Sequence, residues 1–171
     1  GQVNLFDGAW LDVYGGSFHN AGLLKAASGT SYAALTQNTG TVEVAAGAAL
    51  TLPGFVSNAG LIKVDGTLEL APGYNPCTAS LCEGPVPMAA TTTVPAPGAF
   101  TNESTGALTG TGVISVDGGT GTIDNFGLID PAGLGGIGTL TIDGNLVMAD
   151  SSTMAVDIAS PTSHDLLVVT G

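Results

Sequence analysis

The chain has 171 residues, of which only two are basic, both lysine, and 14 are acidic, so its formal net charge is −12. Clusters of lysine and arginine make the phosphate contacts of nucleic-acid-binding proteins and attract anionic membrane surfaces. The composition therefore excludes both of these partners. A positive mean hydropathy of +0.42, without any apolar run approaching the ~18 residues of a membrane span, predicts a folded chain that does not insert into a membrane.

The first 18 residues carry four of the nine aromatic side chains. Residues 9–14 alternate as a strand does, and nearby glycines argue against a helix. We expect these rings to pack in the first coil of the fold or to cap it. A sugar-stacking platform that includes Trp10 and Tyr14 is the alternative interpretation.

A phrase of the form Asn-x-Gly-x-hydrophobic recurs along the chain. It starts at Asn20, Asn38, Asn58 and Asn125, with a looser copy at Asn102. The spacings are 18, 20, 44 and 23 residues, and the long one is about two periods. Self-similarity at a fixed period indicates a repeat architecture, here with about 20 residues per unit.

A second phrase, a hydrophobic residue followed by Asp-Gly or Asp-Gly-x-Leu, lies between copies of the first. Its aspartates are Asp65, Asp117 and Asp143. Asp-Gly tolerates the positive φ angles of tight turns, so each copy predicts a corner between strands. Residues 61–64 and 139–142 alternate with the period of two expected of strands that have one buried face.

Units of this size cannot bury an apolar face alone, but coils stacked on one another can. The repeats therefore predict an all-β parallel β-helix, or β-solenoid, with roughly seven coils of about 20 residues, extending over residues 1–171 as a single unit. We expect the asparagines to lie at an inside corner, each side-chain amide bonded to the asparagines above and below. The three aspartates are interpreted as structural corners that stack on one another.

The segment 71–99 interrupts this pattern, because it holds six of the nine prolines and both cysteines, Cys77 and Cys82. With no second cysteine pair and no histidine nearby, a zinc site would lack half its ligands. We therefore predict a Cys77–Cys82 disulfide and an oxidising compartment. The segment is either an irregular loop without function or the binding site of the chain, with Tyr74 as its best anchor.

The last quarter of the chain resembles a known family. The segments 129–133, 136–146, 152–158 and 164–171 look like the β-strand repeat of autotransporter passenger domains, and they are also similar to filamentous-haemagglutinin-type adhesins. The resemblance implies a right-handed β-helix that is exported across the outer membrane of a Gram-negative bacterium and displayed or released outside. Such passengers are most often adhesins or structural stalks, and a minority carry an enzyme as a separate insertion.

Candidate catalytic patterns are weak. Residues 133–138 match G-x-G-x-x-G, but a predicted strand follows where a dinucleotide fold needs a helix. The two histidines, His19 and His164, are about seven predicted coils apart and cannot share a site. A glycoside hydrolase or lyase using the Asp-Gly carboxylates remains the enzymatic alternative, and calcium at acidic corners stays open.

The sequence thus predicts a non-catalytic stalk or adhesin module, a segment of a longer secreted or surface-displayed protein, with no cofactor and no bound metal. Its expected partner is a glycan or protein on a host or neighbouring cell, and in isolation we expect a monomer. The competing interpretations are a β-helical carbohydrate-active enzyme and a metal-stabilised matrix protein.

Overall fold

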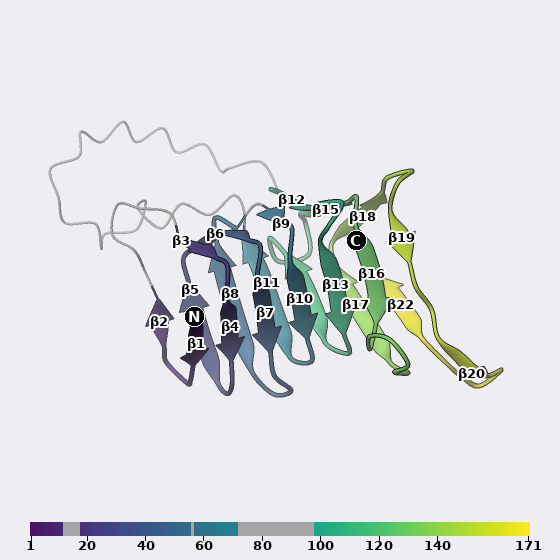
Figure 1. Cartoon of the computed structure of the whole chain (residues 1–171), viewed down its shortest axis with the longest axis horizontal. Helices are drawn as coiled ribbons and strands as arrows, with labels where there is room; N and C mark the ends of the chain where they lie inside the picture. The colour runs from purple at the N-terminus through teal and green to yellow at the C-terminus, as the bar shows by residue number, and fades with distance from the viewer. Residues whose placement is uncertain (12–17, 56, 72–97) are drawn as a thin grey trace, which may run out of the picture.

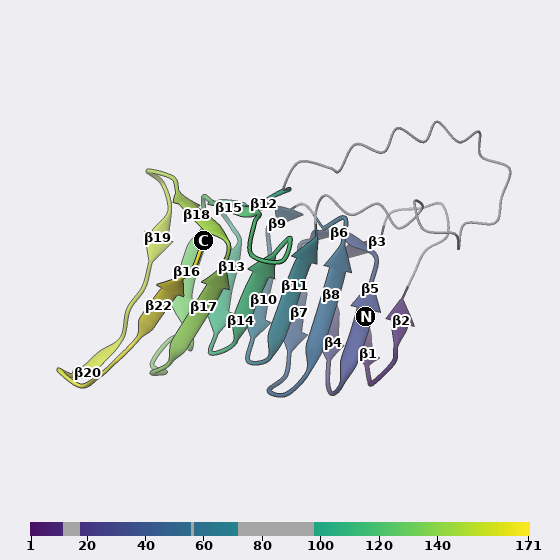
Figure 2. The same cartoon turned by 180° about the vertical axis from the view of Figure 1, so that it is seen from behind.

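The computed structural model describes residues 1–11, 18–55, 57–71 and 98–171, and within these ranges the chain is all-β. Short strands wind into a β-solenoid of about six turns of about 21 residues each (Figure 1). The predicted parallel β-helix is therefore confirmed. The strands of the near layer in Figure 1 run downward, those of the far layer run upward, and the chain advances from left to right, so the coil is right-handed (Figures 1 and 2).

Each complete coil contributes one strand to each of three parallel sheets. Sheet A contains β1 (Gln2–Leu5), β4 (Leu23–Ala26), β7 (Thr41–Val44), β10 (Leu61–Val64), β13 (Ala107–Gly110), β16 (Leu128–Pro131) and β19 (Thr153–Met154). Sheet B contains β2 (Trp10–Leu11), β5 (Thr30–Ala33), β8 (Ala49–Pro53), β11 (Thr67–Ala71), β14 (Val113–Val116), β17 (Thr139–Asp143) and β22 (Leu166–Val169). Sheet C contains β3 (Phe18–Asn20), β6 (Leu35–Asn38), β9 (Ser57–Asn58), β12 (Ala99–Asn102), β15 (Thr122–Asn125) and β18 (Asn145–Met148). Near the C-terminus, β20 (Ile158–Ser160) and β21 (Ser163–His164) form a separate antiparallel hairpin.

The core is a column of identically placed side chains. In sheet A one inward row is fully buried and consists of Leu24, Val42, Ile62, Leu108 and Ile129. Because successive side chains of a strand point to opposite faces, the residues between these point out of the coil. The alternation of apolar and polar residues in the sequence therefore places one face of every strand in the column.

Close packing between coils explains why the third position of the Asn-x-Gly phrase is glycine. A Cβ atom at Gly60 would collide with the carbonyl oxygen of Gly40, and a Cβ at Gly40 would collide with that of Gly22. Successive coils thus come so close at this corner that only glycine fits.

The long spacing in the repeat corresponds to one connection between sheets B and C. Strand β11 ends at Ala71, and β12 begins at Ala99. On the two sides of this connection Phe55 and Phe100 are fully buried with ring centroids 5.2 Å apart. The column therefore continues across it in the same register.

Candidate functional site

The repeated asparagines form a ladder inside the corner between sheets C and A. The ladder consists of Asn20, Asn38, Asn58, Asn102 and Asn125. The Nδ2 of each of the first four donates to the Oδ1 of the asparagine in the next coil, over 2.8 Å in three steps and 2.7 Å in the last. All five side chains are buried. Since the amides bond to one another and to nearby backbone carbonyls, the ladder is structural and presents nothing to a ligand.

The three aspartates of the Asp-Gly phrases lie at two different corners, which corrects the expectation that they stack. Asp65 follows β10 at the corner between sheets A and B, whereas Asp117 and Asp143 lie at the end of sheet-B strands. Asp65 accepts a hydrogen bond from the Thr111 amide and forms a 3.3 Å ion pair with Lys63. Asp143 accepts from Ser115 and Thr170. The phrase marks a turn, and the same turn follows strands of either sheet.

Asp117 lies in a strained turn. It has a positive φ of 47°, and its carboxylate accepts a hydrogen bond from the Gly98 amide at the point where the chain re-enters the coil. Its role is therefore to fix the connection before β12.

Most of the predicted ligand residues lie outside the described residues. Tyr14, Tyr74 and the predicted Cys77–Cys82 disulfide all lie outside the described ranges. Trp10 is described, and it lies on β2 at the edge of sheet B, 63% exposed.

Trp10 stacks on Tyr32, which the sequence did not suggest as a site residue. The two residues are register partners in β2 and β5, with ring centroids 5.2 Å apart and an interplanar angle of 21°. Tyr32 is 40% exposed. Thr51, Glu69, Ser115 and Asp143 continue the same outward row of sheet B. The row therefore starts with an aromatic pair and continues with hydroxyl and carboxylate groups.

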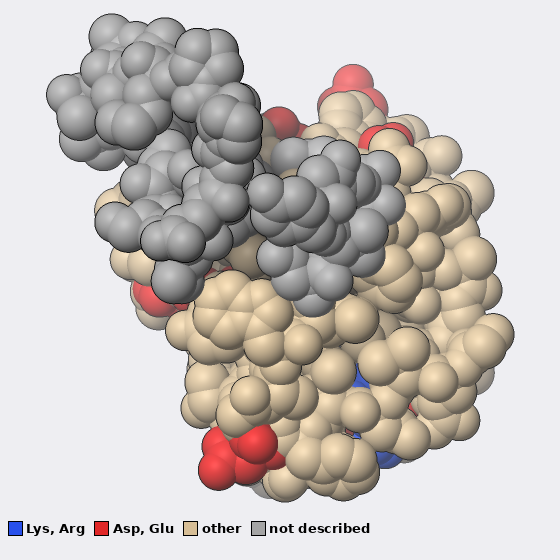
Figure 3. All heavy atoms as spheres, turned by 90° about the vertical axis from the view of Figure 1, so that its left-hand side faces the viewer, with Lys and Arg blue, Asp and Glu red and all other residues tan. Residues whose placement is uncertain are grey.

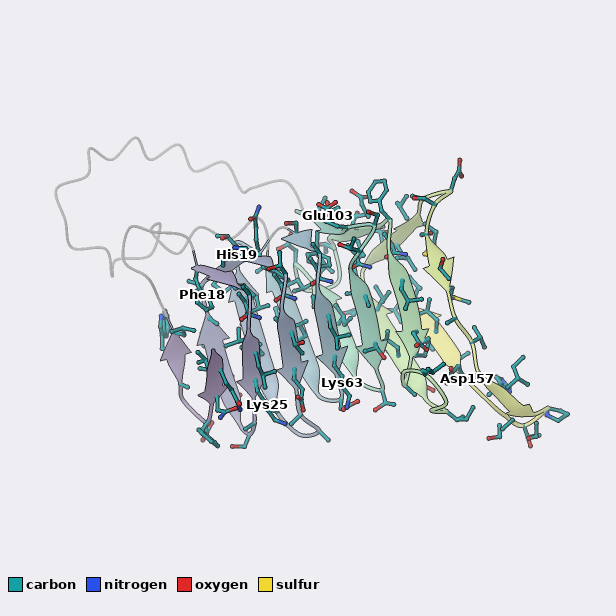
Figure 4. The ribbon with its side chains drawn as sticks, in the orientation of Figure 1. Phe18, His19, Lys25, Lys63, Glu103 and Asp157 are labelled. Carbon is teal, nitrogen blue, oxygen red and sulfur yellow. The ribbon has the colours of Figure 1, made fainter. Side chains whose placement is uncertain are left out.

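The outward face of sheet A carries both lysines of the chain (Figure 4). The Nζ atom of Lys25 lies 2.6 Å from a carboxylate oxygen of Glu43, and Lys63 pairs with Asp65. His19 bonds to Thr39 in the first coils, whereas His164 lies in the β20–β21 hairpin near the other end. The two histidines therefore do not share a site.

A shallow hollow of about 340 Å³ lies at the N-terminal end of the coil stack. It is lined by residues 1–3 and 18–23, which include Val3 of β1 and Phe18 and His19 of β3. Figure 3 views this end, where most of the surface not drawn in grey is neither acidic nor basic. Among the described residues that line it, none carries an acidic or a lysine side chain.

A cluster of three carboxylates lies near the C-terminal end. Asp130, Asp157 and Asp165 each place one oxygen within 4.8 Å of the others. Burial, followed by the nearby charges of Asp157 and then Asp165, raises the pKa of Asp130 above its usual range. Sequence analysis missed this cluster, because the three aspartates belong to different coil segments and share no phrase.

Comparison of the chain with protein-family models, with curated proteins and with solved structures finds no match. Within the described ranges, no helix is long and apolar enough to cross a membrane.

Proposed function

We propose that this chain is a non-catalytic stalk of a secreted or surface-displayed bacterial protein and that it carries an adhesive surface on its first coils. The observation that carries the proposal is the asparagine ladder, which runs without a break from Asn20 to Asn125 beside the apolar column. The side-chain amides of these asparagines join one coil to the next and are not available to a ligand. A stack of this kind suits a spacer.

The outward side chains support the non-catalytic part of the proposal. Acid–base catalysis needs donor and acceptor groups within about 3 Å of each other and of the substrate. The two lysines are paired with carboxylates, and the histidines lie at opposite ends of the stack.

The Trp10–Tyr32 pair supports the adhesive part. Tryptophan and tyrosine are enriched among the residues that dominate binding energy, and their rings offer a flat apolar face with a polar edge. The apolar C–H face of a sugar ring packs on such a surface. Because the Thr51 hydroxyl and the Glu69 carboxylate, both on partly exposed residues, follow the pair in the same sheet row, we propose a glycan as its ligand and a host or neighbouring cell as its source.

The location is proposed from the resemblance of residues 129–171 to autotransporter passengers. A low number of charged residues and a solenoid fold agree with a passenger exported across the outer membrane of a Gram-negative bacterium. Export would also bring Cys77 and Cys82 into an oxidising compartment.

The spacer role is tested by display on a bacterial surface. The chain is inserted between an outer-membrane anchor and an epitope tag, and antibody access to the tag is compared with that of a flexible Gly-Ser linker of equal residue number. A rigid stack should raise the tag above the surface polysaccharide and increase antibody binding. Equal binding with both inserts would contradict the spacer role.

The adhesive role is tested on a glycan array with the purified chain. Trp10→Ala should abolish glycan binding without unfolding the protein, because the side chain is mostly exposed. Phe126→Ala is the matched control, since Phe126 is also exposed but lies after β15 on another side of the coil. Equal loss in both variants, or full binding by Trp10→Ala, would place the adhesive surface elsewhere, and turnover of any glycan would contradict the non-catalytic proposal.

A further inference from the structure

Three carboxylates from three separate segments meet at the C-terminal end of the coil stack. Asp130 lies in β16, Asp157 lies between β19 and β20, and Asp165 lies between β21 and β22. Figure 4 shows Asp157 at this end, beside the last coils. One carboxylate oxygen of each residue lies within 4.8 Å of the other two, and Asp165 is only 4% exposed. Three negative charges are thus gathered in a partly buried place.

Two of these carboxylates have backbone partners. Asp157 accepts a hydrogen bond from the Gly135 amide at 2.7 Å, and Asp165 accepts from the Gly138 amide and the Asp157 amide, both at 2.9 Å. These bonds hold the two side chains in place and leave each oxygen a further lone pair. Asp130 differs, because its Oδ1 is buried and has no hydrogen-bond partner among the described residues.

A second unsatisfied oxygen lies beside Asp130. Thr109 on β13 is the register partner of Asp130, and both side chains are on the outward face, since their neighbours Leu108 and Ile129 are fully buried inside. Thr109 is nevertheless only 9% exposed, because the loop after Pro131 covers it: a Cβ added to Gly133 would lie 3.1 Å from the Thr109 Oγ1. Within the described part of the chain this hydroxyl has no partner either.

Buried polar atoms without partners are rare and call for a specific explanation. Here the two unsatisfied atoms are both oxygens and belong to neighbouring residues under one loop. The same loop supplies the Gly135 and Gly138 amides that orient the other two carboxylates toward Asp130. A positive ion would interact favourably with the three carboxylates and would supply the missing partner of the Asp130 Oδ1.

We propose that Asp130, Asp157 and Asp165, together with the Thr109 hydroxyl, bind a calcium ion. Calcium takes six to eight oxygen ligands at about 2.3–2.6 Å, so two oxygens on opposite sides of one ion are about 4.6–5.2 Å apart. The spread of up to 4.8 Å in this cluster fits that geometry. Magnesium demands near-ideal octahedral geometry and gives up its water ligands reluctantly, so it is the poorer fit to a partly buried cluster of side chains.

The ion would join the last two coils. It would connect the end of β16 to the segments on both sides of the β20–β21 hairpin, which otherwise pairs only with itself among the described strands. Calcium is therefore expected to order the C-terminal end of the stack and to stabilise the folded chain.

The test is thermal unfolding of the full chain in 1 mM EDTA and in 10 mM CaCl2, each variant being compared with itself. Calcium should raise the Tm of the wild-type protein by about 3–8 °C, as expected for a site with an affinity typical of extracellular modules. MgCl2 at the same concentration should raise it less. Asp130→Asn should remove the calcium response. Asp124→Asn is the matched control and should keep the response, because Asp124 is a partly buried aspartate on the preceding strand, β15, in sheet C.

Isothermal titration with CaCl2 gives a second readout that does not depend on stability. Thr109→Val keeps the shape of the side chain and should weaken calcium binding several-fold with an unchanged circular dichroism spectrum. A wild-type protein whose Tm and heat of titration do not respond to calcium would overturn the proposal. An Asp130→Asn variant that responds as the wild type does would also overturn it.

Discussion

The side chains of Asn58 and Asn102 are joined by a 2.8 Å hydrogen bond although 44 residues separate them in the sequence. The same spacing is 18 to 23 residues elsewhere in the ladder. The extra residues lie between the end of β11 at Ala71 and the start of β12 at Ala99, and the register of the ladder is the same before and after them.

We predict that residues 72–97 can be replaced by a link of about five residues with little effect on stability, since the corresponding connection between β14 and β15 spans residues 117–121. The Tm of the shortened protein should lie within about 3 °C of the full chain, because loop length contributes weakly to stability. Thermal unfolding followed by circular dichroism measures this. A large loss of Tm would mean that the segment packs against the column.

Removing one member of the asparagine ladder should be costly. Asn58→Ala leaves the buried Asn102 Oδ1 without its donor. It also removes one acceptor of the Asn38 Nδ2, which keeps the carbonyl oxygens of Gly40 and Leu61. An orphaned buried polar group costs about 1–3 kcal/mol, so we expect a loss of about 1–3 kcal/mol in the free energy of unfolding.

Gln37→Ala is the matched control for this variant, since Gln37 lies on the same sheet with an exposed side chain. Denaturant unfolding should show a change of less than about 0.5 kcal/mol for the control. A comparable loss in both variants would show that the ladder contributes no more than an ordinary polar residue.

The raised pKa of Asp130 predicts a pH dependence in calcium-free buffer. Burial and the charges of Asp157 and Asp165 favour the protonated form in the folded state. The folded protein then binds more protons than the unfolded chain, so the contribution of Asp130 is fully present below the unfolded pKa and is lost as pH rises through the folded one.

The measurement is the Tm difference between the wild type and Asp130→Asn in EDTA, followed from about pH 4 to pH 7. The wild type should lose stability relative to the variant as the pH rises, because asparagine stays neutral. A difference that grows in favour of the wild type would contradict the direction of the shift.

The repeated features of this fold could be predicted from the sequence, whereas the contacts that occur once could not. The alternation in residues 61–64 and the periodic asparagines identify the buried face and the ladder, because every coil repeats them. Asp65 and Asp143 carry the same turn phrase but end strands of different sheets, so the phrase does not reveal which corner it forms.

The aromatic pair and the carboxylate cluster could not be predicted from the sequence for a related reason. Trp10 and Tyr32 lie in neighbouring coils but belong to no common phrase, so their stacking depends on a register that only the structure fixes. Asp130, Asp157 and Asp165 meet because the last coil includes a hairpin, which no other described coil contains.

If the coils form one rigid spacer, the distance between its two ends has a single value, and measuring that distance is the most direct test of the stalk. Gln2 and Thr153 are exposed residues of the same row of sheet A, on its first and last strands, six strand spacings apart. With Cys77 and Cys82 replaced by serine and spin labels at positions 2 and 153, pulsed electron resonance should give a single narrow distribution near 29 Å, at ~4.8 Å per step. A broad distribution, or several distances, would contradict a rigid stalk.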